Sequence, residues 1–159
     1  MAHRPHPTQL NGWLCFAYTG VGTLYTFSET LNGQYYRSIL NRCLLESVRR
    51  LFRLPTQWYL LHDNSRIHSA PPVREWLHNR GITVIDFPTY SPDLNPIENL
   101  IADVKRRQHQ HTVDTVDELQ RVVHEEWDKT SVHLLHKLVH SMPRRCEAVI
   151  AAKGYMTHY

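Results

Sequence analysis

Two short apolar segments open the pattern of hydrophobic and polar positions along this chain. Residues 13–18 and 23–27 are rich in aromatic and aliphatic side chains, and Gly20, Val21 and Gly22 lie between them. Two glycines in three residues supply the backbone freedom that a tight turn needs. The pattern therefore predicts two antiparallel strands joined by a turn at these three residues.

Apolar residues take a helical spacing from Asn32 onward. They recur at steps of three and four positions, at Tyr36, Ile39, Leu40, Cys43, Leu44, Val48 and Leu51. Such a spacing places them on one face of a helix. We expect an amphipathic helix that opens at Asn32 and Gly33, packs this face on the sheet and ends at Pro55.

A strand, a helix and another strand are predicted next. Residues 58–61 form a continuous apolar run that stops abruptly at His62, and residues 82–87 are predicted as a second buried strand. Between them, Pro71 suits the first turn of a helix and Gly81 suits its end. A helical connection makes two strands parallel, and continuous apolar runs are typical of strands covered on both faces. The expected unit is a parallel pair of buried strands.

The carboxyl-terminal third of the chain is predicted to be helical. Asn95 is suited to cap the first of these helices, because its side chain can accept a hydrogen bond from a free amide of the first turn. Thr115 and Glu118 have the spacing of a capping box, which predicts a second helix. Further helices are expected from Ser131 and over residues 143–154.

Composition narrows the class of protein. Of the 159 residues, 42% are hydrophobic and 21% are charged, which is typical of one globular domain. The 6 glycines, 9 prolines and 3 cysteines exclude collagen-like, low-complexity and disulfide-rich proteins. No apolar run approaches the roughly 20 residues of a membrane span, and the polar residues 1–11 do not resemble a secretory signal. We expect an intracellular protein that is not a membrane protein.

The whole chain has a formal net charge of +3, and its positive charge is concentrated in the first third. Residues 1–53 contain six basic and two acidic residues, whereas residues 114–128 contain six acidic residues and one arginine. A basic surface can meet an anionic partner such as DNA. The candidates for contact with DNA phosphates are Arg49, Arg50, Arg53, Lys105, Arg106 and Arg107. Alternatively, these residues only complement the dipoles of the helices that they end.

Asp63 and Glu98 are the candidate catalytic and metal-binding residues. Asp63 directly follows residues 58–61, and functional side chains collect beyond the carboxyl ends of parallel strands. Glu98 begins the helix after the next strand, with 34 residues between the two acids. Carboxylates hold Mg²⁺ in sites for phosphoryl transfer. Two alternatives remain: Asp63 only closes a turn, or Glu98 only bonds the Asn95 amide in a capping box.

Several other polar residues are weaker candidates. His133, His136 and His140 share one predicted helix face, which is compatible with zinc ligands, but no cysteine lies nearby and a solvated face is favoured. Asp86 and Asp93 are spare carboxylates near the expected site. We expect neither to be a metal ligand, and Asp93 to cap a turn.

Two stretches of the sequence resemble a known family. They are HDNSRIH at residues 62–68 and SPDLNPIENL at residues 91–100, and they are similar to the catalytic core of mariner-type transposases of the DDE superfamily. The resemblance also extends over Gly12-Trp13 and residues 30–36, 141–145 and 152–155. It covers nearly the whole chain, and SPDLNPIENL with its 34-residue spacing is its most specific part.

The resemblance implies an α/β protein of the RNase H-like superfamily, with a mixed sheet flanked by helices. It implies dependence on magnesium or manganese, and cleavage and strand transfer of double-stranded DNA at transposon ends. Asp63 and Glu98 match the family's second and third catalytic acids. Asn64, His68 and Asn95 match positions of the supporting loops, where hydrogen bonding within the loop is the favoured role. A nuclear location follows from the substrate, and a homodimer is possible.

The chain departs from the family's pattern before Asp63. The family's first catalytic Asp lies on the strand that precedes the Gly12-Trp13 region, and this chain has no Asp before Asp63. That strand is also the central strand of the family's sheet. We therefore expect a polar segment at residues 1–11 and a partial catalytic domain at residues 12–159. We expect this domain to lack its central strand and the family's helix-turn-helix modules, and to be inactive alone.

Three functions follow from these observations. The leading hypothesis is a fragment of a transposase catalytic domain. The alternative is a non-catalytic DNA-binding or oligomerisation module derived from a transposase. A nuclease acting on RNA-containing duplexes is the third, and the SPDLNPIENL stretch argues against it.

Overall fold

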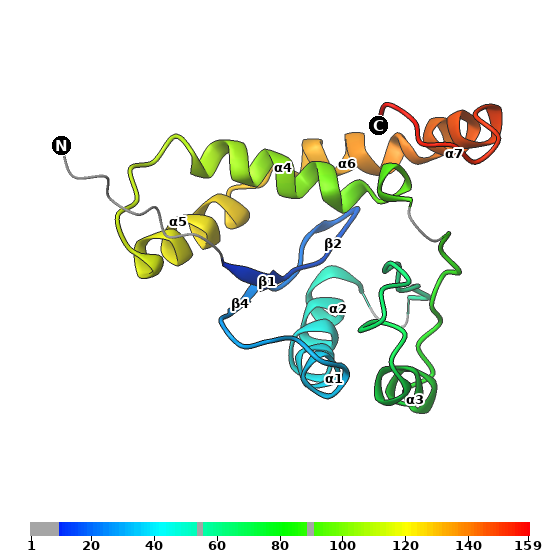
Figure 1. Ribbon diagram of the computed structural model, residues 1–159, viewed down its shortest axis with the longest axis horizontal. Coiled ribbons are helices and arrows are strands. Elements are labelled where there is room, and N and C mark those ends of the chain that lie inside the picture. The colour runs from blue at the N-terminus through cyan, green and yellow to red at the C-terminus, as the bar shows by residue number, and fades with distance from the viewer. Residues whose placement is uncertain (1–9, 54–55, 89–90) are drawn as a thin grey trace.

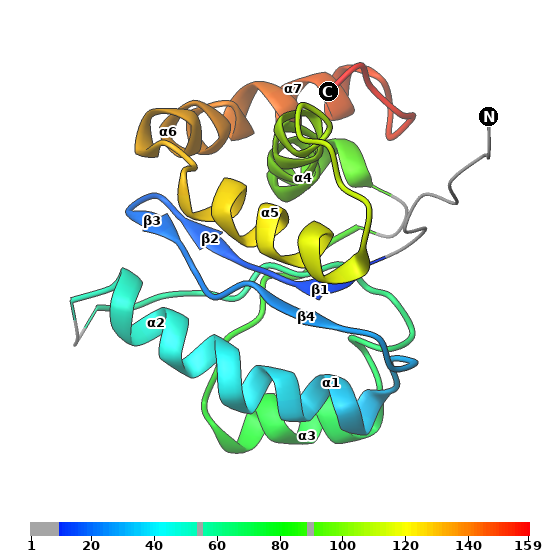
Figure 2. The same cartoon turned by 90° about the vertical axis from the view of Figure 1, so that its left-hand side faces the viewer.

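The computed structural model describes residues 10–53, 56–88 and 91–159. The elements are β1 (Asn11–Trp13), β2 (Phe16–Ala17), β3 (Gly20–Val21), β4 (Tyr25–Phe27), α1 (Gly33–Ile39), the π-helical η1 (Leu40–Leu44), α2 (Leu45–Leu51), α3 (Pro71–Asn79), the 3₁₀ turn η2 (Pro92–Leu94), α4 (Pro96–Gln108), α5 (Val116–Asp128), α6 (Val132–His140) and α7 (Met142–Ala151). The strands lie in the middle, with α1 to α3 on one side and α4 to α7 on the other (Figures 1 and 2). The predicted domain boundary after residue 11 falls next to residues 1–9, which lie outside the described residues.

The first two predicted strands form an antiparallel hairpin, as expected. β1 pairs with β4 and β2 pairs with β3, and between the two ladders the Gly22 amide donates to the Cys15 carbonyl at 2.7 Å. The predicted turn position is wrong, because Gly20 belongs to β3 and the turn lies at residues 18–19. Gly22 answers a different need. A Cβ there would lie 2.3 Å from the Cys15 sulfur, so only glycine fits the close approach of the two strands.

The amphipathic helix is confirmed, with a π-helical stretch, η1, in its middle. The Asn32 side chain caps it by accepting from the Tyr35 amide at 2.9 Å. The last helical residue is Leu51, so the predicted end at Pro55 is late; Pro55 itself lies outside the described residues. Ser47 is fully buried where the helix meets the hairpin. Its hydroxyl donates to the Cys43 carbonyl at 2.7 Å and accepts from the Thr23 amide at 2.9 Å.

The predicted strands at residues 58–61 and 82–87 are parallel, but only a single bridge, Leu60 with Val84, joins them. The Leu60 amide donates to the Thr83 carbonyl at 2.9 Å, and the Ile85 amide donates to the Leu60 carbonyl at 2.8 Å. The expectation that these segments are covered on both faces is wrong. Leu60 and Val84 pack on the core, whereas Tyr59 is 51% and Ile85 is 45% exposed. Among the described residues no ladder joins this pair to the hairpin.

The predicted helices of the carboxyl-terminal third are all present, and local sequence signals set their starts. Asn95 caps α4 and Ser131 caps α6. Thr115 and Glu118 form the expected capping box at α5. Where the chain is described, no helix is long and apolar enough to cross a lipid bilayer.

Two main clusters of buried side chains hold the layers together. Between the hairpin and α4 to α6, Trp127 is 1% exposed and its indole nitrogen donates to the Gly22 carbonyl at 2.9 Å. Leu100 and Leu135 are fully buried beside it. On the opposite side, Leu40 and Val73 are fully buried in the cluster that joins α1, η1, α2 and α3. Burial of such side chains stabilises the fold by about 1.5–3 kcal/mol each.

Candidate functional site

Asp63 directly follows the parallel segment that contains Leu60, and contacts within its own loop hold its carboxylate. Oδ1 of Asp63 accepts from the Ser65 amide at 3.0 Å and lies 2.6 Å from Nδ1 of His68. Partial burial would raise the pKa of Asp63, but the hydrogen bonds from Ser65 and the charge of His68 outweigh it and keep this pKa below its ordinary value. With its side chain 54% exposed, Asp63 is an ionised carboxylate open to solvent.

A stack of aromatic rings supports this loop from behind. The His68 ring stacks on Tyr36 with 4.3 Å between centroids, and on His62 at 5.0 Å with the rings nearly parallel. The Tyr36 hydroxyl lies 3.4 Å from Nδ1 of His62. Burial lowers the pKa of His62 to about 4, with the charge of His68 acting in the same direction. Tyr36 lies in α1, and in the sequence it was marked by its place on the buried helix face and within residues 30–36 of the family resemblance.

Asn64 connects the same loop to residues 82–87. Its side-chain amide donates to the Phe87 carbonyl, at the end of residues 82–87. Asn64 therefore joins the ends of the two parallel segments, and His68 orients the Asp63 carboxylate. Both residues act here through hydrogen bonds within the loops, the favoured role for them.

Glu98 lies in the first turn of α4 and its side chain is exposed. Oδ1 of Asn95 accepts from the Ile97 amide at 3.4 Å, and the Asn95 amide donates to the Pro92 carbonyl at 3.0 Å. The alternative in which Glu98 bonds the Asn95 amide is thus wrong, because η2 already occupies that amide. Cap and turn leave the Glu98 carboxylate facing solvent at the helix start, where the helix dipole favours a negative charge.

The donor chemistry of this pair suits a hard cation, but the set is small. Asp63 and Glu98 offer carboxylate oxygens, the ligands that Mg²⁺ and Mn²⁺ prefer. Across residues 10–53, 56–88 and 91–159, no group of three or more His, Cys, Asp or Glu side chains is arranged to hold a metal ion.

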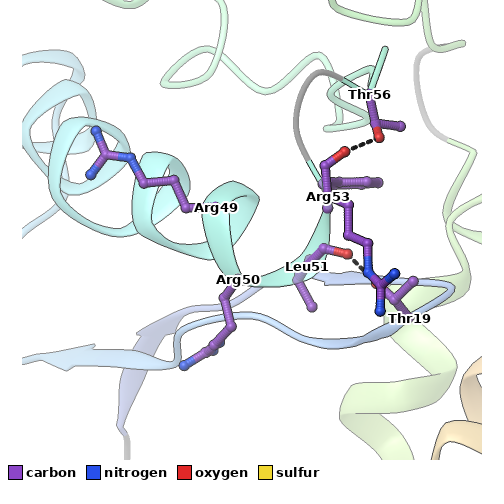
Figure 3. A pocket seen from close by; sticks show the side chains of 7 residues that line it. Thr19, Arg49, Arg50, Leu51, Arg53 and Thr56 are labelled. Carbon is purple, nitrogen blue, oxygen red and sulfur yellow. Dashed lines mark hydrogen bonds between the residues drawn. The ribbon is translucent and has the colours of Figure 1, made fainter.

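The first group of predicted DNA-binding residues lines an open pocket of about 730 Å³ at the end of α2 (Figure 3). Arg49, Arg50 and Arg53 contribute three guanidinium groups. The pocket wall is fixed by hydrogen bonds of main-chain carbonyls: Leu51 accepts from the Thr19 hydroxyl at 2.6 Å, and Val21 accepts from Arg50 at 3.3 Å. The pocket lies next to the hairpin turn and three arginines are among its lining residues.

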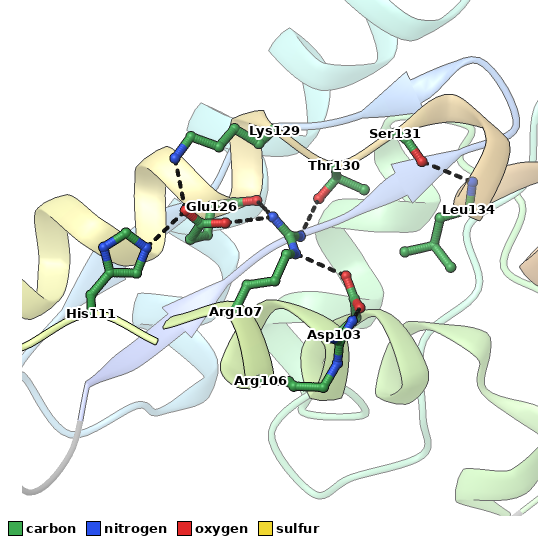
Figure 4. Close-up of polar contacts among 9 residues, drawn as sticks. All are labelled: Asp103, Arg106, Arg107, His111, Glu126, Lys129, Thr130, Ser131 and Leu134. Atoms are coloured by element: carbon green, nitrogen blue, oxygen red, sulfur yellow. Dashed lines mark hydrogen bonds and ion pairs between the residues drawn. The ribbon is translucent and has the colours of Figure 1, made fainter. Parts of the chain in front are cut away.

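The second group behaves differently, because Arg107 is engaged inside the protein (Figure 4). Its guanidinium pairs with Asp103 at 2.9 Å and with Glu126 at 2.8 Å, and its side chain is only 20% exposed. Arg106 also pairs with Asp103 but is 67% exposed. Lys105 is exposed. Arg107 thus joins α4 to α5, and of this group Lys105 and Arg106 face solvent.

Glu126 is the centre of this ion network. The hydrogen bond from Lys129 at 2.8 Å, together with those from Arg107 and from His111 at 3.1 Å, lowers the pKa of Glu126 to about 2. Its side chain is 7% exposed, and a buried carboxylate needs such partners to remain charged. Sequence reasoning missed Glu126, because its partners come from two helices and the loop between them.

Of the weaker candidates, Asp93 is buried and accepts from the amide and hydroxyl of Thr157 at 3.0 and 2.9 Å. Asp86 is exposed. A solvated face is confirmed for His133 and His140, which are exposed, and is wrong for the half-buried His136. His136 stacks on Tyr18 at 3.8 Å, and His140 lies 3.3 Å from the Tyr18 hydroxyl, so the hairpin turn rests on α6.

Comparison with known proteins decides the family. Residues 4–120 match the family described as DDE superfamily endonuclease. The chain belongs to this superfamily. The Tc1 transposase of Caenorhabditis elegans is 34% identical to this chain over 151 residues, which cover 92% of this chain and 53% of that relative. The chain thus spans about half the length of the curated relatives that it matches.

Solved structures show the same fold. The catalytic domain of Mos1 transposase, described with raltegravir and Mg, has a TM-score of 0.81 at 23% identity. The match covers 91% of this chain and 75% of the Mos1 chain. The Mos1 paired-end complex with left transposon end has a TM-score of 0.82 at 25% identity, covering 98% and 47%. These likenesses confirm the predicted RNase H-like fold, and the relatives confirm the predicted Tc1/mariner type.

Proposed function

We propose that this DDE domain is the part of a Tc1/mariner-type transposase that contacts metal and DNA, with Asp63 and Glu98 as ligands of Mg²⁺ or Mn²⁺. The observation that carries the proposal is the state of Asp63: exposed, ionised, and oriented by Ser65 and His68 at the end of a parallel segment. The Mos1 catalytic domain described with Mg supports the choice of cation. When bound, such an ion activates an attacking oxygen and stabilises the charge that develops on a phosphate.

Residues of the chain itself perform the remaining tasks in this proposal. His68 and Asn64 hold the Asp63 loop in one geometry, and Asn95 sets the start of α4 that presents Glu98. Preorganised ligands bind more tightly because less conformational entropy is lost on binding. Because the chain has no Asp before Asp63 to match the family's first catalytic acid, we expect no DNA cleavage by this chain alone.

Double-stranded DNA is the proposed macromolecular partner, as transposon ends and as target. Arg49, Arg50 and Arg53 would contact the phosphate backbone from their pocket, with Lys105 and Arg106 as further contacts. Arg107 is left out of this surface because of its internal ion pairs. Work on DNA implies the nucleus as the site of action, and pairing of two transposon ends implies a homodimer.

Binding of Mn²⁺ tests the metal part of this proposal. Asp63→Asn and Glu98→Gln should each weaken Mn²⁺ binding, measured by calorimetry, by more than the roughly tenfold that loss of an outer-shell partner costs. Asp86→Asn, a change at another exposed carboxylate, is the matched control and should bind like the wild type. Unchanged Mn²⁺ affinity in both acid variants would exclude these residues as ligands.

Binding of a fluorescein-labelled DNA duplex tests the second part. Replacing Arg49, Arg50 and Arg53 together by Ala should weaken binding and reduce the slope of log K against log salt by about 0.9 for each lost phosphate contact. Arg74→Ala on α3 serves as the control for charge alone. The non-catalytic DNA-binding alternative predicts a different result. In that case the wild type binds the duplex but no Mn²⁺, and Asp63→Asn and Glu98→Gln leave duplex binding unchanged.

A further inference from the structure

The segment after α7 folds back onto the turn that precedes α4. In Figure 1 this red segment turns back from α7 toward the start of α4. The contact is specific: the amide and the hydroxyl of Thr157 both donate to Oδ2 of Asp93, at 3.0 and 2.9 Å. Asp93 is only 5% exposed. A buried carboxylate is costly unless it is hydrogen-bonded, and Thr157 supplies two of the hydrogen bonds of the Asp93 carboxylate, beside those of the Asp93 and Leu94 amides.

Arg145 of α7 makes a second connection to the same region. It is 3% exposed, and its guanidinium donates in three directions: to the Asp93 carbonyl at 2.7 Å, to Oδ1 of Asn99 at 2.8 Å and to the Ser141 hydroxyl at 2.8 Å. The Tyr159 ring covers it, with 5.0 Å from Cζ to the ring centroid. The planar fork of an arginine fixes the relative positions of the groups that it bonds.

These contacts surround Glu98 in the sequence. Asp93 lies in η2 before Asn95, and Asn99 directly follows Glu98. Fixing both sides of a first helical turn limits its fraying, and its carboxylate then samples fewer positions. The contacts bypass the Glu98 side chain itself, which stays exposed and available to a ligand.

We infer that Arg145 and residues 155–159 form a strap that positions the start of α4 and thereby the Glu98 carboxylate. Arg145 and Thr157 are positioning residues in this scheme, since neither touches the proposed metal ligands. The inference rests on the proposed function only for the role of Glu98 as a metal ligand. The strap itself concerns how rigidly residues 93–99 are held.

Amide hydrogen exchange on the full chain tests the strap. The amides of Leu94, Asn95 and Glu98 donate to Ser91, Pro92 and Asn95 carbonyls, so their exchange reports the order of this turn. Thr157→Val and deletion of residues 155–159 should speed their exchange by on the order of tenfold, because a hydrogen bond to a buried carboxylate is lost. Amides within α5 should keep their wild-type rates. Thr157→Ser, which retains the hydroxyl, should restore slow exchange, and Tyr155→Ala in the same segment should change nothing.

Three outcomes would overturn the strap. They are wild-type exchange at Leu94, Asn95 and Glu98 after both changes, a uniform increase that includes α5, and failure of Thr157→Ser to restore slow exchange. A uniform increase would mean a general contribution to stability instead of local positioning. Mn²⁺ affinity of the same variants separates the two proposals. Local loosening with weaker Mn²⁺ binding supports both, whereas local loosening in a chain that binds no Mn²⁺ supports the strap and contradicts the proposed metal site.

Discussion

The two candidate acids are held by different kinds of structure. Asp63 lies in a loop after a single parallel bridge, and its supports are Ser65, His68 and the Asn64 link to Phe87, all within or next to that loop. Glu98 begins a helix whose next residues, Leu100 and Val104, are buried against Trp127. The Asp63 side depends on a few polar and aromatic contacts, and the Glu98 side depends on a hydrophobic core.

This difference indicates how each acid responds to change. A loop held by hydrogen bonds can open locally without unfolding of the domain, whereas a helix start on a deep core moves only when the core or its end contacts are disturbed. The Asp63 side also carries exposed apolar residues, Tyr59 and Ile85, on the outer face of the bridge. Three predictions separate the two regions, in order of decreasing effect.

Trp127→Ala should cause the largest loss of stability. Its side chain is 1% exposed, and its indole donates to the Gly22 carbonyl, so truncation leaves a cavity and an unpaired carbonyl. We expect the free energy of unfolding, from urea denaturation, to fall by about 3–5 kcal/mol. Trp76→Ala, at a half-buried tryptophan of α3, is the control and should cost clearly less. Equal losses would contradict the expectation that the core between the hairpin and α4 to α6 contributes more to stability than α3 does at Trp76.

Glu126→Gln should change the stability of the same layer in acid. Since the folded pKa of Glu126 is about 2 against an ordinary value of 4.5, the unfolded chain binds this proton first as the pH falls. The contribution is therefore complete above about pH 4.5 and is lost between about pH 4.5 and pH 2. The variant should lose less stability than the wild type over that range in pH-dependent urea denaturation. Glu125→Gln, whose ion pair with Arg121 is exposed, should behave like the wild type.

Asn64→Ala should have the smallest global effect and the most local one. It removes the hydrogen bond to the Phe87 carbonyl and should lower the free energy of unfolding by about 1 kcal/mol. Exchange of the Ser65 amide, which donates to Asp63, should rise more than exchange within α4. Asn79→Ala at the exposed end of α3 is the matched control. Equal increases in both regions would show that the Asp63 loop is not a separate unit.

Local signals made much of the fold predictable. Asn32, Asn95, Thr115 with Glu118, and Ser131 act within a few residues of themselves, so the starts of four helices follow directly from the sequence. Asp63 and Glu98 were also recognisable, because their motifs are contiguous. Burial of residues 58–61 and 82–87 was not predictable from their own side chains, since exposure of Tyr59 and Ile85 depends on which elements cover them.

The helices, most of their amino-terminal caps, the parallel relation of residues 58–61 and 82–87, and the superfamily follow from the amino-acid sequence. Long-range packing makes Arg107 internal, brings His136 and His140 to the hairpin turn, and brings Thr157 and Arg145 to the turn before Glu98. The physical reason is the range of the interactions. Capping and periodicity act over three or four residues, whereas a buried ion or hydrogen bond depends on a partner that folding brings from a distant part of the chain.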